Sequence, residues 1–134
     1  MNDRADWKDY WLKAKENLDA ALSTQEKKQY NVCASRAYYA VFLASIAALI
    51  KLTSFRAEDN KWQHAAVQTE LSRHLILRKK ILASEHRRTP MDLMELRHLA
   101  DYNPESVSAR EAKSASDRAQ RFLSEVGRVL VESL

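Results

Sequence analysis

Residues that make turns are scarce in this chain. Its 134 residues include one glycine and two prolines, so few positions carry the chemistry on which tight turns depend. β-branched residues are also sparse, and they never alternate with polar ones as they would in a half-buried strand. The sequence therefore predicts an all-α protein, a single up-and-down bundle of about five helices that forms one domain over residues 1–134.

Cysteine and clustered metal ligands are lacking too. The single Cys33 excludes an intrachain disulfide, and the N-terminal residues contain no apolar signal region, so we expect a cytoplasmic protein. The four histidines are spread through the chain, and the single glycine cannot make a phosphate-binding loop. We therefore expect no metal and no cofactor.

One long apolar stretch, residues 30–52, organises the chain. From Ala37 to Ile50 it carries no charge and is apolar around nearly its whole circumference, which is the pattern of a helix surrounded by other elements. The fourteen uncharged residues 37–50 are too few to cross a bilayer, and Arg36 and Lys51 bracket them closely. We therefore expect a buried core helix, no membrane partner, and a polar partner for the Arg36 guanidinium.

Amphipathic stripes predict four more helices. They cover residues 6–22, 61–82, 90–102 and a final segment that begins near residue 108. Ser108 and Glu111 form a capping box at the start of the last helix, and Asn60 with Gln63 is expected to cap the third. His64 then lies in the first turn of the third helix, where the helix dipole favours a neutral imidazole. We favour a packed or solvated histidine there over a ligand contact.

The end of the fourth helix carries the first candidate site. Asp101 stands where the carbonyl end of the helix dipole opposes its charge, so a cation should lie beside it. Arg97, four residues earlier, shares its face, but Arg36 of the central helix is the partner that we predict, in a polar network with Tyr39. A structural ion-pair and tyrosine network that locks two helices is the favoured interpretation.

A basic segment, residues 73–88, is the second candidate site. It carries six cations against Glu85 alone: Arg73, Arg78, Lys79, Lys80, Arg87 and Arg88. Such a segment attracts phosphates or an acidic partner protein, and a solvated charge run is the alternative interpretation. It has no interleaved aromatic residues, which argues against the stacking of single-stranded bases.

Three motifs follow one another along the chain: S-R-A-Y-Y-A-V-F at residues 35–42, K-W-Q-H at 61–64 and L-R-H-L-A-D-Y at 96–102. Over essentially its whole length the chain resembles the prokaryotic HEPN domains, and within them the small stand-alone branch marked by R-A-Y-Y-A and R-x-x-A-D-Y. The resemblance implies a helical bundle that usually dimerises and is often encoded beside a minimal nucleotidyltransferase in toxin–antitoxin or defence modules. Many HEPN domains are metal-independent ribonucleases.

The ribonuclease motif of that family is an arginine followed, after four to six residues, by a histidine, commonly with a tyrosine two positions beyond. No arginine in this chain has a histidine at that spacing. With Tyr102 placed on the motif tyrosine, the histidine position holds Ala100 and the arginine position holds Glu95. Only Tyr102 carries over, as a residue that a partner nucleotidyltransferase could adenylylate.

These observations lead to one favoured hypothesis and two rivals. We predict a homodimer that binds RNA, another nucleic acid or a nucleotide, with or without a nucleotidyltransferase partner, and that lacks the usual ribonuclease activity. The first rival is a metal-independent ribonuclease toxin that uses Arg97, His98 and Tyr102. The second is a scaffold whose motifs only hold the bundle together. The dimer is expected because apolar residues remain on the outer sides of the helices, around Trp62, Leu77 and Met94.

Overall fold

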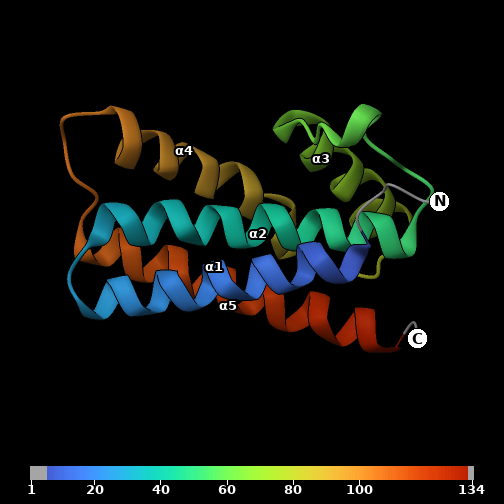
Figure 1. Ribbon diagram of the computed structural model, residues 1–134, viewed down its shortest axis with the longest axis horizontal. Helices are drawn as coiled ribbons and strands as arrows, with labels where there is room; N and C mark the ends of the chain where they lie inside the picture. Colours follow the sequence, from blue (N-terminus) through green and yellow to red (C-terminus); the bar gives the residue numbers. More distant parts are fainter. Residues whose placement is uncertain (1–5, 133–134) are drawn as a thin grey trace.

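Helix α2 is the centre of the fold, as predicted for the apolar stretch. The computed structural model describes residues 6–132, without the side chains of Asn60 and Arg78. α2 spans Tyr30–Leu52, and most of its residues between Cys33 and Leu49 are buried. By length and composition this helix could cross a membrane, yet all four other α-helices pack against it and cover it (Figure 1).

The described residues contain five α-helices and no strand: α1 (Trp7–Glu26), α2, α3 (His64–Glu70), α4 (Thr89–Tyr102) and α5 (Ala109–Glu132). α1, α2 and α5 run side by side along the length of the molecule, and α3 and α4 cover the remaining side of α2 (Figure 1). The predicted all-α bundle is confirmed.

Small side chains let α1 and α2 pack closely. Ala14 and Ala21 of α1 are fully buried, and so are Ala40, Ala44 and Ala47 of α2. These alanines recur at steps of three, four and seven residues, so on each helix they lie along one face. Neighbouring helices can approach closely along that face. Larger side chains at these positions would have to push the helices apart.

The third helix begins later than the sequence predicted. A short 3-10 turn, η1 (Glu58–Asn60), precedes α3, and Gln63 takes the N-cap position that we had assigned to Asn60. In α4 the difference is a single residue, since the helix begins at Thr89 with Pro90 in its first turn. The capping box of α5 is confirmed: Ser108 Oγ accepts from the Glu111 amide at 3.1 Å, and Glu111 Oε1 accepts from the Ser108 amide at 3.0 Å.

The second half of the predicted third helix is a π-helix, η2 (Leu71–Arg78). π-helical turns are rare and often occur at functional sites. This one buries Leu75 and Ile76 in the core and leaves the next residue, Leu77, 52% exposed. Lys80, with φ of 52°, has a left-handed conformation and separates η2 from the 3-10 turn η3 (Ser84–Arg87).

Two of the three apolar residues expected to be left uncovered are packed within the bundle. The Trp62 ring lies 6.0 Å from the ring of Tyr10 and 6.0 Å from that of Phe55. Met94 packs against the core and lies 3.3 Å from the Gln68 amide nitrogen. Only Leu77 of the three is exposed to solvent, so the apolar surface near Trp62 and Met94 is smaller than the sequence suggested.

We predict that Ala14→Leu lowers the free energy of unfolding by about 1–3 kcal/mol, because overpacking a filled helix interface forces side chains and backbone apart. Lys13→Leu introduces the same side chain at the neighbouring exposed position of α1 and should change stability by less than about 0.5 kcal/mol. Urea denaturation followed by circular dichroism measures both. Equal stability of the two variants would contradict the close α1–α2 packing.

Candidate functional site

Arg97 anchors α4 to α2. Its side chain is 10% exposed, and its Nη1 donates to the Tyr39 hydroxyl at 2.7 Å. The guanidinium lies 5.3 Å from the ring centroids of both Tyr38 and Tyr39. Aromatic faces stabilise a cation that is partly removed from water, so the two tyrosines of the R-A-Y-Y-A motif hold the arginine of the R-x-x-A-D-Y motif.

Asp101 completes this network. Its Oδ2 lies 3.9 Å from Arg97 Nη1, one turn away on the same helix, and 3.5 Å from the Ser35 hydroxyl, which donates to it. The buried Arg97 therefore has one distant carboxylate, and its Nε has no hydrogen-bond partner among the described residues. A buried charge with incomplete pairing is costly, so the tyrosine faces carry much of its stabilisation.

The predicted ion pair between Arg36 and Asp101 is wrong. Within residues 6–132, Arg36 forms no ion pair with Asp101; its Nη1 donates instead to Asn17 Oδ1 of α1 at 3.0 Å, and its guanidinium lies 5.0 Å from the Tyr39 ring. Neighbouring residues on a helix point about 100° apart. Since Ser35 faces Asp101 on α4, Arg36 turns toward α1.

His64 is packed, as expected from its place at a helix start. Its ring stacks on Phe42 with 4.2 Å between centroids, and its Nδ1 is hydrogen bonded to the Tyr38 hydroxyl. Burial lowers the pKa of His64, and the nearby charges of Arg97 and His98 lower it further. Burial also raises the pKa of Tyr38 to about 12. Both shifts favour a neutral pair in which the tyrosine donates and the imidazole accepts.

The structure separates the residues of the ribonuclease hypothesis. His98 and Tyr102 lie on the exposed side of α4, with ring centroids 5.7 Å apart, and Tyr102 is 73% exposed. Arg97 points to the buried side of α4, against Tyr38 and Tyr39. The motif positions of the orthodox ribonucleases do not supply their usual groups either, because exposed Glu95 is no cation at the arginine position and half-buried Ala100 cannot transfer a proton at the histidine position.

The cations of the basic segment lie in two different environments: most are exposed to solvent, and Lys79 is bound to the end of α2. Arg73 is exposed and lies 3.9 Å from Glu70, while Arg87 is exposed and Arg88 has a side chain that is 76% exposed. Lys79 instead donates to the Leu52 carbonyl at 3.0 Å and so stabilises the C-terminal end of α2. Lys80 is exposed, and the Arg78 side chain lies outside the described residues.

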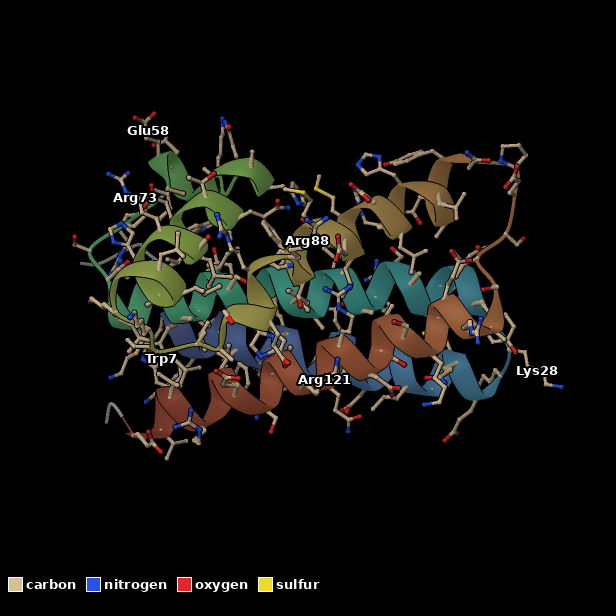
Figure 2. The ribbon with its side chains drawn as sticks, turned by 180° about the vertical axis from the view of Figure 1, so that it is seen from behind. Trp7, Lys28, Glu58, Arg73, Arg88 and Arg121 are labelled. Atoms are coloured by element: carbon tan, nitrogen blue, oxygen red, sulfur yellow. The ribbon has the colours of Figure 1, made fainter. Side chains whose placement is uncertain are left out.

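Two arginines of α5, which the sequence reasoning missed, join the exposed arginines of this segment. Asp92 lies 3.6 Å from Arg88 Nη2 and 3.0 Å from Arg118 Nη2, so it connects the start of α4 to α5. Arg121 Nε lies 3.8 Å from Glu85 Oε1 in η3. Figure 2 shows Arg88 and Arg121 near the middle of the molecule, with Arg73 toward its α3 end.

We call this surface the basic face, defined by Arg73, Arg87, Arg88, Arg118 and Arg121. The sequence carries a partial signal for its α5 members, because four cations of α5 form two pairs whose members are three residues apart and so lie close on the helix surface. Those cations are Arg110, Lys113, Arg118 and Arg121.

A buried histidine holds η3 against α5. Glu125 of α5 accepts two hydrogen bonds, one from the Ala83 amide at 2.6 Å and one in a contact of 2.9 Å with His86 Nε2. The His86 side chain is 3% exposed, and its ring meets Phe122 edge-on at 5.2 Å. This contact fixes the chain immediately before Arg87 and Arg88.

The model of the HEPN domain family matches residues 7–129. The chain therefore belongs to the HEPN domain family, as its motifs indicated. At the level of the family this points to a nucleic-acid-related, toxin or defence module. No curated protein matches the chain.

We predict that thermal stability falls as the pH drops below about 6.5 and that His64 contributes to this fall. The folded chain lowers the pKa of His64 below its ordinary 6.5, so the unfolded state takes up the proton first and is stabilised as the pH falls. The midpoint of thermal unfolding at pH 7.5 and 5.5 measures the effect. His64→Phe keeps the aromatic stack and should show a smaller decline.

His98→Phe is the matched control, since it removes an exposed histidine from α4. Because burial is the main cause of the His64 shift, this variant should keep most of the decline. If His64→Phe lost as much stability on acidification as the unmodified chain, His64 would not be the group responsible.

Proposed function

We propose that this HEPN-family protein belongs to a prokaryotic toxin–antitoxin or defence module and binds the phosphates of RNA or of a nucleotide without acting as an orthodox ribonuclease. The observation that carries this proposal is the basic face. It combines four exposed arginines, which are Arg73 of η2, Arg87 of η3, Arg88 just before α4 and Arg121 of α5, with the half-buried Arg118 of α5. Surface cations near one another attract a polyanion whatever its base sequence.

Two ion pairs of this face leave their arginines available to phosphate, whereas the half-buried Arg118 is held by Asp92 at 3.0 Å. The Arg88–Asp92 and Arg121–Glu85 distances are 3.6 and 3.8 Å, and both arginine side chains are more than half exposed. Exposed pairs of this kind contribute about 0–1 kcal/mol each. A phosphate can therefore compete for these guanidinium groups at little cost.

The placement of Arg97 argues against ribonuclease activity. A phosphate-binding arginine must reach its substrate, whereas Arg97 is buried against Tyr38 and Tyr39. The exposed His98 and Tyr102 lie on another side of α4. The rival hypothesis needs all three groups around one phosphate, and a guanidinium buried against α2 is not available to a phosphate that contacts the exposed His98 and Tyr102.

Tyr102 supports a role for a nucleotidyltransferase partner. It is 73% exposed and follows Asp101 at the end of α4, so an enzyme could reach its hydroxyl without unfolding the helix. We therefore include adenylylation of Tyr102 by such a partner in the proposal, together with a cytoplasmic location and a homodimeric state.

The test is retention of a labelled single-stranded RNA by the purified protein, in chelator and over a range of salt concentrations. We expect binding without cleavage. Each phosphate contact with a single strand contributes about 0.7 to the salt slope. Arg88→Ala with Arg121→Ala should therefore weaken binding and reduce the slope by about 1.4, if each arginine contacts one phosphate.

Lys13→Ala with Lys27→Ala is the matched control, because it removes two exposed cations, one in α1 and one directly after it, and leaves the basic face intact. Equal weakening by both pairs would mean that binding follows total charge and not this surface. Robust cleavage that Arg97→Ala or His98→Ala abolishes would reject the proposal and favour the ribonuclease rival.

A further inference from the structure

A shallow groove of about 350 Å³ lies between the π-helix η2 and the beginning of α4. Two apolar side chains line it, Leu77 and Met91, and they are 52% and 53% exposed. Large apolar side chains that stay half exposed next to one another in a hollow are typical of a protein-interaction site. In this case both come from elements that are otherwise well packed.

The charge of the groove is of one sign. Arg73 and Arg87 line it beside the two apolar residues, and the rest of its lining is uncharged. Arg87 forms no ion pair within residues 6–132, and the Arg73–Glu70 distance of 3.9 Å is at the limit of such a pair. Met91 lies in the first turn of α4, so the positive end of the helix dipole adds to the arginine charges.

The backbone explains why Leu77 is available. The π-helical turns of η2 direct Leu75 and Ile76 inward and leave Leu77 on the surface. After Leu77 the chain turns back, and the Ile81 and Leu82 amides donate hydrogen bonds to the Leu75 carbonyl, at 2.8 and 3.0 Å. Leu77 is therefore held outward by the hydrogen-bond pattern of its own segment.

We propose that this groove binds an acidic segment of a partner protein. The segment inserts an apolar side chain between Leu77 and Met91 and places carboxylates beside Arg73 and Arg87. The inference rests on the proposed function only in that the chain acts with a protein partner. It adds the surface that the partner uses and the chemistry of the segment that occupies it.

The lining favours protein over nucleic acid as the occupant. Single-stranded nucleic acid is bound by cations combined with aromatic faces on which bases stack, and no aromatic residue lines this groove. Methionine and arginine are both enriched at protein interfaces, where methionine adapts its shape to the partner side chain. Burying Leu77 and Met91 also gives an apolar contribution that a phosphate backbone cannot supply.

The experiment selects a phage-displayed library of random dodecapeptides against the purified full chain. Selected peptides should combine Asp or Glu with an apolar residue, and one of them is then synthesised for fluorescence polarisation. Leu77→Ser with Met91→Ser should weaken its binding about tenfold or more, as expected for residues at the centre of an interface. Arg87→Ala should weaken it and reduce its salt dependence.

Leu12→Ser with Val131→Ser is the matched control, since these residues are 56% and 67% exposed elsewhere on the bundle. It should leave peptide binding unchanged, and circular dichroism checks that each variant is folded. The proposal is overturned if no acidic peptide is enriched, or if both serine pairs bind the peptide as the unmodified chain does.

RNA binding by the same variants separates this inference from the proposed function. Unchanged RNA retention by Leu77→Ser with Met91→Ser supports a protein site whose apolar residues take no part in RNA binding, although Arg73 and Arg87 belong to both surfaces. Loss of RNA retention in that variant, with RNA displacing the peptide, would assign the groove to the nucleic-acid surface and overturn the inference. Peptide binding by a chain that retains no RNA would refute the RNA proposal and leave this one supported.

Discussion

The covering of α2 is the constraint on which the rest of the structure depends. A helix that is apolar on nearly every side must be surrounded, and α1, α3, α4 and α5 each take one part of its circumference. The contact with α4 has the added task of accommodating Arg97. The faces of Tyr38 and Tyr39 stabilise the buried Arg97 charge. Residues of the R-A-Y-Y-A and R-x-x-A-D-Y motifs therefore form the two sides of one contact between α2 and α4.

The sequence was sufficient to predict which segments are helical and which one is central, because hydrophobic periodicity and capping residues are local signals. It was not sufficient to pair Arg36. A helix with one apolar stripe has its rotation fixed by that stripe, but α2 is apolar all round and its sequence leaves the rotation open. Packing then directed Ser35 toward Asp101 and Arg36 toward Asn17.

The remaining differences have equally local causes. Apolar residues at Val67, Leu71 and Leu75 suit an α-helix and a π-helix alike over a short segment, so their spacing predicted one continuous helix and missed η2. The basic segment was found because its cations are contiguous in sequence. Arg118 and Arg121 join the same surface by ion pairs with Asp92 and Glu85. These carboxylates are far from α5 in the sequence, and only the fold brings them close.

The Glu125 carboxylate holds in place the part of the candidate site that carries Arg87 and Arg88. Glu125 binds the Ala83 amide and His86, which holds η3 on α5 and fixes the backbone that carries Arg87 and Arg88. A surface that is already ordered loses less conformational entropy on binding than a loop that must first be ordered. The same contact places Arg87 at one edge of the groove beside Met91. A single half-buried acid in α5 therefore preorganises both the basic face and the groove, although it belongs to neither.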